Sequence, residues 1–317
     1  MRCRLEPMAD PADRAAAPPP RFSAWACALG LARTLRPQQW VKNLFVLAPV
    51  VFAKHLTHPS VIKGALGAFG IFCLLSGAVY ALNDLVDAEA DRSHPIKRRR
   101  PIAAGVVPAA LARVAVVGLA LVALGGSLLG PRYFTALAGG YFVLNVAYSL
   151  RLKRVAYLDV ASIAAGFVLR VLAGGAAIRT PVSGYMIACT ALLALFLGFG
   201  KRRHELLSVG ASARRVVLRA YSAGVLLVAL LVTGTGAVGA YLAYCLDPDT
   251  QRLLAFGWLW VTAVHPAFGV ARFLQLAGSR PEAESPTQEM LRDTPFMLNL
   301  FLWAVEVVAV VYRLRPT

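Results

Sequence analysis

The stretch YALNDLVDAEADRSHPIKRRRPIAAG, residues 80–105, decides how the chain is interpreted. Acidic side chains and an amide follow directly on an apolar run at 61–82, and a basic block comes next at 97–100. Residues three or four apart share one face of a helix. The spacing therefore predicts one stripe of an amide and three carboxylates where a membrane helix meets water. We call this the acidic stripe: Asn83, Asp84, Asp87 and Asp91.

Carboxylates at this spacing repel one another, by a few tenths of a kcal/mol per pair on an exposed helix. A bound cation would relieve that repulsion. Magnesium is the best candidate, because it takes one or two carboxylates, keeps several waters and uses substrate phosphates as further ligands. We expect Asp84, Asp87 and Asp91 to hold it, with Asn83 assisting. The alternative is a solvated helix end whose charges balance the adjacent arginines.

The composition is that of a membrane protein, since 58% of the 317 residues are hydrophobic and only 15% are charged. We expect an all-α, polytopic helical bundle with about nine transmembrane helices. Nine apolar stretches are long enough to cross a bilayer: 41–57, 61–82, 102–129, 133–150, 156–178, 183–200, 216–246, 252–276 and 296–313.

The net charge of +17 does not indicate nucleic acid, because the position of the charge matters more than its sum. Lys and Arg fall mainly before the first predicted span and after every second one. Cytoplasmic loops carry such an excess, so we expect a cytoplasmic N-terminus and an acidic stripe on the cytoplasmic side. The scattered cysteines look like packing residues.

Residues 1–22 are rich in Pro and Ala and lack the apolar core of a secretory signal. We expect a disordered cytoplasmic tail there, followed by one intramembrane domain over 23–317. At 35–43 the sequence LRPQQWVKN places Lys42 at the mouth of the first predicted span. It is either a basic membrane anchor or a phosphate ligand.

Polar residues also lie around the fifth predicted span. Tyr148, Lys153 and Asp159 lie in or beside the loop before it, and Arg170 sits about three turns into it. A charge at that depth costs at least about 2.5 kcal/mol unless it is paired or hydrated. This predicts a polar cavity between helices, and the alternative is an arginine that snorkels to the membrane surface or is paired for structural reasons.

The sixth predicted span ends in GKRRHEL, residues 200–206. Lys201 and Glu205 share one helical face, and Arg202 lies beside them. They are either substrate ligands or a positive-inside anchor with one ion pair. The position of this segment favours substrate ligands, because it follows the third predicted pair of helices just as the acidic stripe follows the first pair.

Several motifs together resemble one known family, the UbiA superfamily of intramembrane prenyltransferases, over about residues 33–313. The best match is its decaprenyl-phosphate phosphoribosyltransferase branch. The motifs are RPQQWVKNLFVLAP at 36–49, NDLVDAEADRSHPIKRRRPIAAG at 83–105, LDVASIAAGFVLRVLAGG at 158–175, GKRRHEL at 200–206 and the loop at 284–293. Most of the superfamily carries a second acidic motif after the sixth span, whereas this chain is basic there.

The resemblance implies an integral protein of the bacterial inner membrane that joins 5-phosphoribosyl diphosphate to a polyprenyl phosphate with Mg²⁺. Basic residues in place of the second acidic motif fit this reaction, because it brings three anionic groups together and Arg binds phosphate bidentately. A homo-oligomer stays open. The residues expected to bind substrate are Lys42, Lys97, Arg100, Tyr148, Asp159, Arg170, Lys201, Arg202 and Glu205.

Two other functions stay open at this stage. The chain could be a UbiA-type prenyltransferase that moves a prenyl group from prenyl diphosphate to an aromatic or other acceptor. It could also be a transporter or a lipid-binding scaffold, because buried charges mark ion pathways as well. Against transport, the charge is concentrated on one side of the membrane.

Overall fold

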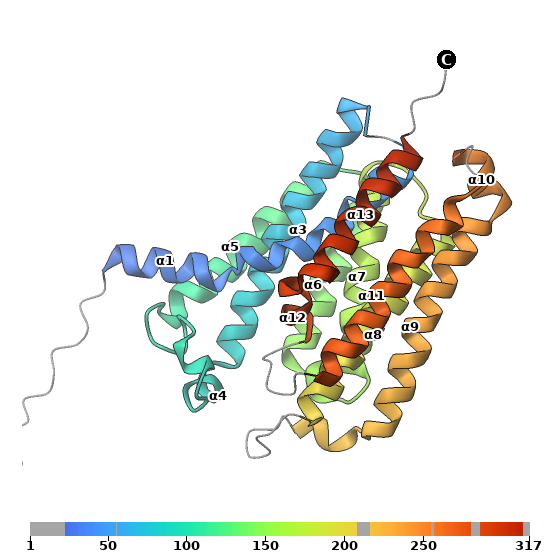
Figure 1. The fold of residues 1–317 in the computed structure, drawn as a ribbon. Helices are drawn as coiled ribbons and strands as arrows, with labels where there is room; N and C mark the ends of the chain where they lie inside the picture. The colour runs from blue at the N-terminus through green and yellow to red at the C-terminus, as the bar shows by residue number, and fades with distance from the viewer. Residues whose placement is uncertain (1–22, 55, 208–215, 255–256, 280–285, 313–317) are drawn as a thin grey trace, which may run out of the picture.

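The computed structural model of the chain is a bundle of α-helices and short 3₁₀ helices (Figure 1). No strand occurs among the residues that it describes, which agrees with the expected all-α fold. The predicted tail at 1–22 lies outside the described residues. Those residues are 23–54, 56–207, 216–254, 257–279 and 286–312.

Six helices of the described chain are long and apolar enough to cross a membrane. At 1.5 Å per residue, even the shortest of them covers about 27 Å, close to the thickness of a bilayer core. They are α3 (Pro59–Val86), α5 (Ala109–Ser127), α7 (Leu158–Ala177), α8 (Gly184–Leu207), α9 (Ala223–Leu246) and α13 (Thr294–Val311).

The first predicted span is not one continuous helix. It falls on η2 (Pro37–Val46) and α2 (Ala48–Phe52). Pro37 is the first residue of η2 and Pro49 the second residue of α2, and proline has no N–H to donate to a preceding turn of helix.

The other two unconfirmed spans differ from the expectation in their own ways. The stretch 252–276 is divided among α10 (Pro248–Leu254), η7 (Leu259–Ala263) and α11 (Val264–Ser279). The stretch 133–150 does form one helix, α6 (Arg132–Leu150), but its glycines and polar residues lower its hydropathy. The count of nine spans therefore stays a prediction, and six are supported.

The remaining elements are short. α1 (Ala24–Thr34) extends to one side of the bundle (Figure 1) and begins at Ser23, whose hydroxyl accepts from the N–H of Ala26. The others follow or precede the long helices near one end of the bundle: α4 (Ala88–Arg92), η3 (Lys97–Arg99), η4 (Leu152–Arg154), η6 (Val216–Ala220) and α12 (Pro286–Arg292).

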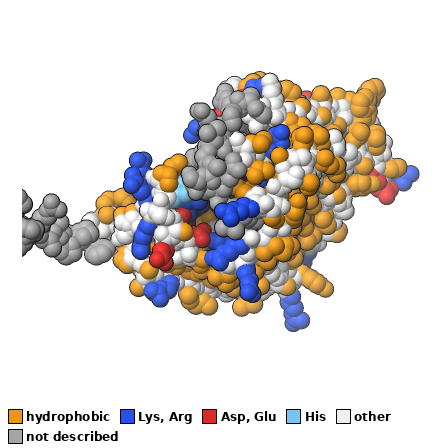
Figure 2. Space-filling view, turned by 90° about the horizontal axis from the view of Figure 1, so that it is seen from below, with side chains coloured by type: hydrophobic (Ala, Val, Ile, Leu, Met, Phe, Trp, Pro, Cys, Tyr) orange, Lys and Arg blue, Asp and Glu red, His pale blue; other side chains and the backbone are white. Residues whose placement is uncertain are grey.

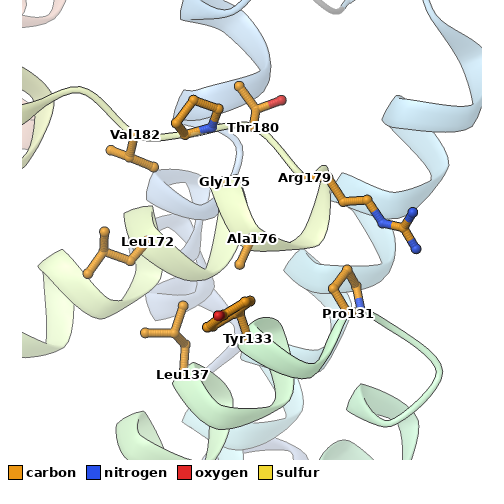
Figure 3. A pocket seen from close by; sticks show the side chains of 10 residues that line it. Pro131, Tyr133, Leu137, Leu172, Gly175, Ala176, Arg179, Thr180 and Val182 are labelled. Atoms are coloured by element: carbon orange, nitrogen blue, oxygen red, sulfur yellow. The ribbon is translucent and has the colours of Figure 1, made fainter.

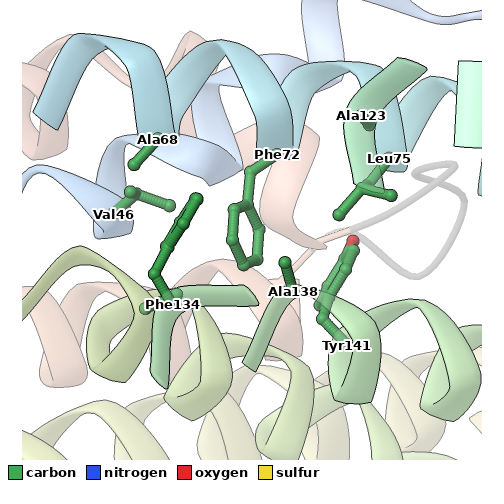
Figure 4. Packing of buried hydrophobic residues seen from close by; sticks show 9 residues of the cluster. Val46, Ala68, Phe72, Leu75, Ala123, Phe134, Ala138 and Tyr141 are labelled. Atoms are coloured by element: carbon green, nitrogen blue, oxygen red, sulfur yellow. The ribbon is translucent and has the colours of Figure 1, made fainter. Parts of the chain in front are cut away.

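The largest core cluster joins η2, α3, α5, α6 and α7 (Figure 4). The ring of Phe72 lies 5.0 Å from that of Tyr141 and 6.4 Å from that of Phe134. On α7, a Cβ added to Gly174 would lie 1.9 Å from the carbonyl oxygen of Val46. Only glycine allows η2 to approach α7 so closely, and this contact sets the position of the charged residues on η2.

One end of the bundle gathers much of the charge. Seen from below, Lys, Arg, Asp and Glu side chains crowd the middle of this face, and hydrophobic side chains surround them (Figure 2). The end of α3, the loop that contains η3, and the short helix η4 all lie at this end. The acidic stripe expected from the sequence therefore sits among basic side chains.

Candidate active site

Asp84 lies in the last turn of α3 and is only 2% exposed. Arg36 Nη2 donates to Asp84 Oδ1 at 2.6 Å, and Arg100 Nη1 donates to the same oxygen at 3.1 Å. Arg100 Nη1 also donates to Asp91 Oδ2 at 2.6 Å. Two carboxylates of the acidic stripe are therefore neutralised by arginines that lie outside α3.

Asp87 is placed differently, because its side chain is 33% exposed and faces another cation. Lys153 Nζ, on η4, donates to Asp87 Oδ1 at 2.6 Å and to Asn83 Oδ1 at 3.0 Å. Two hard oxygens thus converge on one positive charge. This donor set fits Mg²⁺, which needs few protein ligands when waters and phosphates complete its shell.

The expected three-carboxylate site is not assembled. In the part of the chain that the structure describes, no three His, Cys, Asp or Glu side chains form a group that could hold an ion. The reason is that Arg36 and Arg100 bind Asp84 and Asp91. Asn83 and Asp87 remain as the pair whose geometry fits a metal.

The segment before α3 brings further cations to this place. Arg36 directly precedes η2 and has φ 52°. This is a left-handed conformation, which is unfavourable for any residue with a Cβ. Its guanidinium carbon lies 5.2 Å from the centre of the Tyr80 ring. Gln39 Oε1 accepts from Lys42 Nζ at 2.8 Å and from Tyr80 at 3.4 Å.

Lys42 is the most informative of these cations. Lys42 lies on η2, outside the six long helices. Burial is the main cause that lowers the pKa of its ammonium group to about 8, and the positive charges of Lys201, Arg170 and Arg36 lower it as well. Within the described residues its hydrogen bond goes to neutral Gln39 and no ion pair involves it. Like charges gathered around a desolvated ammonium make a site for an anion, and phosphate suits it best.

Arg170 contributes charge but little free donor capacity. It is 6% exposed, and its Nε donates to Asn43 Oδ1 at 2.8 Å. Nη1 donates to the carbonyl of Gly166 at 3.0 Å and Nη2 to the Tyr141 hydroxyl at 2.7 Å. All three nitrogens are engaged, so Arg170 fastens η2 to α6 and α7. The structurally paired arginine, one of the two alternatives from the sequence, is the one found.

A second charged group, which we call the α7–α8 latch, consists of Asp159, Arg202, Glu205 and Tyr221. Arg202 Nε lies 2.7 Å from Asp159 Oδ2, and Arg202 also pairs with Glu205. The Tyr221 hydroxyl donates to Asp159 and accepts from the backbone N–H of Tyr157 at 2.7 Å. The side chain of Arg202 is 2% exposed and that of Asp159 is fully buried.

The pair of Asp159 and Arg202 at the centre of the latch is closed to solvent. Burial raises the pKa of Tyr221, and its hydrogen bond to Asp159 raises it further, so that the phenol stays protonated and keeps donating. Arg202 can reach a phosphate only by leaving the buried carboxylate of Asp159 without a cation, which is strongly unfavourable. Gly198 belongs to the same packing, since a Cβ there would lie 2.6 Å from Val160.

The structure therefore sorts the candidates from the sequence into groups. Asp87 and Asn83 lie at the more open end of the site and Lys42 is buried near Lys201, whereas Arg170, Asp159 and Arg202 are tied into the fold. Three more are partly buried and keep their place as candidates: Lys97, Tyr148 and Glu205.

Two residues at the centre of the site were not among the candidates. Arg36 and Lys153 each bind a carboxylate of the acidic stripe. Both had a simpler explanation in the sequence, as positive charge on the cytoplasmic side of a membrane span. The Arg36-Pro37 step was the one available signal, because the residue before proline is restricted in conformation.

The sequence model of the UbiA prenyltransferase family matches residues 43–248. Decaprenyl-phosphate phosphoribosyltransferases are similar over nearly their whole length. The protein of Mycolicibacterium smegmatis is 32% identical, with 96% of this chain and 98% of that protein covered. The protein of Corynebacterium glutamicum is 32% identical, with 89% and 87% covered.

Solved structures share the fold. A UbiA homolog from Archaeoglobus fulgidus bound to DMAPP and Mg²⁺ superimposes with a TM-score of 0.66 at 18% identity, covering 90% of this chain and 100% of that one. A digeranylgeranylglyceryl phosphate synthase gives a TM-score of 0.64 at 14% identity, with 90% and 99% covered. At these identities the likeness extends to the arrangement of helices.

Proposed function

This chain belongs to the UbiA prenyltransferase family, and on that premise we propose that it transfers a 5-phosphoribosyl group to a polyprenyl phosphate. The donor is 5-phosphoribosyl diphosphate, and diphosphate is released. The relatives named decaprenyl-phosphate phosphoribosyltransferase support this assignment at 31% to 32% identity. Decaprenyl phosphate is accordingly the first lipid to test.

One observation of the structure carries the proposal. The oxygens of Asn83 and Asp87 lie together at the end of α3. Lys42, a cation near other cations, shares Gln39 with Tyr80, which lies earlier on α3. A diphosphate with its metal ion would need the oxygens of Asn83 and Asp87, and a second phosphate would need the positive charge around Lys42. Transfer between two phosphorylated molecules needs both at once.

We assign the two phosphate groups by depth. Lys42 bonds to Gln39 beside Tyr80, one helical turn further into α3 than Asp84. A polyprenyl phosphate has its tail in the bilayer and reaches the site from the membrane side, so that its phosphate meets the deeper cation. The soluble donor meets the open end, where Asp87 is 33% exposed.

Asn83 and Asp87 would hold the magnesium ion, which when bound supplies positive charge to the diphosphate as a leaving group. Lys153, which now lies between those two oxygens, is placed to bind a diphosphate oxygen. Arg100 adds a second positive charge at the same end. These groups stabilise negative charge that grows as the leaving group departs.

The chemical step needs no strong base. An oxygen of the lipid phosphate forms a bond to C1 of the ribose, and the bond from C1 to the diphosphate oxygen breaks. The electron pair of that bond leaves with the diphosphate. Because a phosphate monoester is already largely ionised near neutral pH, Lys42 only has to hold it in line for attack.

Prenyl transfer is the second candidate, and the fold favours it in one respect: the A. fulgidus homolog with the same arrangement of helices was solved with DMAPP and with GPP. The end of α8 argues against it in this chain. That end holds Lys201 and Arg202, where a second acidic motif would be needed to hold a second metal ion.

We further propose that the charged end faces the cytoplasm of a bacterial plasma membrane. The distribution of Lys and Arg along the sequence supports this orientation. It also gives the water-soluble donor access to the site.

A direct assay tests the function. Membranes that contain the protein are given labelled 5-phosphoribosyl diphosphate with Mg²⁺ and decaprenyl phosphate, and a parallel sample receives labelled prenyl diphosphate with an aromatic acid. We expect label in the lipid extract of the first sample only. Label in the second sample alone would replace the proposal with prenyl transfer.

A further inference from the structure

The end of the bundle opposite the acidic stripe has a hollow that the proposed reaction does not use. It has a volume of about 400 Å³ and lies between the start of α6, the end of α7 and the connection that follows α7 (Figure 3). α7 alone puts about 20 to 30 Å between Asp159 and the residues that line this hollow. The lining residues are Pro131, Tyr133, Leu137, Leu172, Ala176 and Val182, with Arg179 and Thr180 at the edge.

The walls of the hollow are apolar. Leu137 of α6 and Leu172 of α7 face each other across it, and Val182 closes one side (Figure 3). Tyr133, in the first turn of α6, is 82% exposed, and aromatic residues are common near the ends of membrane helices. A wall of this kind is suited to hydrocarbon.

The polar edge carries positive charge. Arg179 extends from the end of α7 past Pro131 (Figure 3), and exposed Arg132 lies between two lining residues. Neither arginine takes part in an ion pair within the described part of the chain. The two connections that line the hollow, 128–133 and 178–183, contain no Asp or Glu, whereas Asp247 and Asp249 lie on the connection that follows α9.

The connection itself is held firmly. Arg179 has φ 56°, and a Cβ added to Gly175 would lie 2.4 Å from Val182 and 2.8 Å from the carbonyl oxygen of Thr180. The Thr180 N–H donates back to the carbonyl of Gly175 at 2.9 Å. The backbone that carries Arg179 therefore has a fixed position beside the hollow.

We propose that this hollow binds an anionic phospholipid of the membrane leaflet opposite the active site. The lipid phosphate pairs with Arg179, with Arg132 close by, and an acyl chain lies against the apolar wall. Guanidinium groups bind phosphate bidentately. Positive charge at a membrane surface favours anionic over zwitterionic lipids.

The position of the arginines strengthens the argument. The side of a membrane protein opposite its positively charged loops usually carries few Lys or Arg residues. Two arginines lie beside one apolar hollow, and the two connections that line it contain no acidic residue to pair with them. This inference does not depend on the proposed reaction.

Lipid retention tests the site. The protein is purified in mild detergent, offered phosphatidylglycerol or phosphatidylcholine, and measured by native mass spectrometry. We expect phosphatidylglycerol to be retained in preference, and Arg179→Gln to weaken its retention about fivefold, the effect of one cation at a charged surface. Arg179→Lys should keep most of the preference.

Arg113→Gln is the matched control, because Arg113 is also exposed but lies at the start of α5, near the charged end. It should retain phosphatidylglycerol as the unaltered protein does. Thermal unfolding without added lipid checks that both variants are folded. Equal retention of the two lipids, or unchanged retention in Arg179→Gln, would overturn the proposal.

Discussion

At the end of α3 the charged pairs are partly open to solvent, whereas at the end of α8 they are closed. The side chains of Asp87 and Lys153 are 33% and 13% exposed, but those of Asp159 and Arg202 are 0% and 2% exposed. The open pairs can exchange a protein partner for a substrate or a metal. The closed pairs cannot do so without leaving a charge buried alone.

The comparison shows what a charged motif does and does not indicate. Both segments follow a long apolar helix, and both combine acidic and basic residues at helical spacing. Their difference lies in partners from elsewhere in the chain. Tyr221 and Asp159 close the latch at α8, while η4 brings only one lysine to Asp87.

The largest expected effect comes from breaking the closed region. Arg202→Gln leaves Asp159 buried without its cation, and losing one partner of a buried pair costs about 3 to 5 kcal/mol. We expect a lower unfolding temperature in detergent, with activity lost only as far as folded protein is lost. A variant that keeps its unfolding temperature and fails only to bind substrate would place Arg202 in the binding site.

The open region should respond in the opposite way. Asp87→Asn keeps the shape of the side chain and removes its charge, so that the rate of transfer should fall about 100-fold or more, as when one stabilising group is removed. The unfolding temperature should stay close to that of the unaltered protein. Asp249→Asn is the control, since its pair with Arg252 is exposed and at the far end of α9. A rate near normal in Asp87→Asn would contradict the metal assignment.

Lys42 tests the assignment of the deeper cation. Lys42→Gln removes a charged donor, and such hydrogen bonds contribute about 1.5 to 3 kcal/mol. We expect the KM for the lipid phosphate to rise about 10- to 100-fold, with little change in the KM for the ribosyl donor. Lys54→Gln, at the opposite end of the bundle, should change neither. The reverse pattern, with only the donor KM raised, would exchange the two phosphate positions.

A smaller effect should appear in the pH dependence. Lys42 has a pKa lowered to about 8, so its ammonium is charged below that pH and loses its proton above it. The KM for the lipid phosphate should rise a few-fold, and at most about tenfold, from pH 7 to pH 9. A bound phosphate opposes the loss of the proton and reduces the change. The same rise in Lys42→Gln would show that another group titrates.

Much of the outline was predictable from the sequence, because membrane helices depend on composition and length. α3 lies where the apolar run predicts it, but it ends at Val86, so that Asp91 of the acidic stripe lies on the separate helix α4. The first predicted span was harder, since a hydropathy window averages over Pro49, which lies in the first turn of α2.

The partners of each charge were not predictable, because they come from distant segments. Arg36 and Asp84 are 48 residues apart, and Lys153 and Asp87 are 66 apart. Arg170 shows the same limit: its depth in α7 indicated a polar environment, but only the fold reveals that Asn43, Gly166 and Tyr141 take up its donors.

Direct binding of the two donors to one purified protein tests the central claim most closely. Equilibrium binding of 5-phosphoribosyl diphosphate and of a prenyl diphosphate is measured with Mg²⁺ and without an acceptor, for the unaltered protein and for Asp87→Asn. Our account predicts that the ribosyl donor binds more tightly and that Asp87→Asn loses this affinity. Tighter binding of the prenyl diphosphate, or ribosyl-donor binding that does not depend on Asp87, would contradict it.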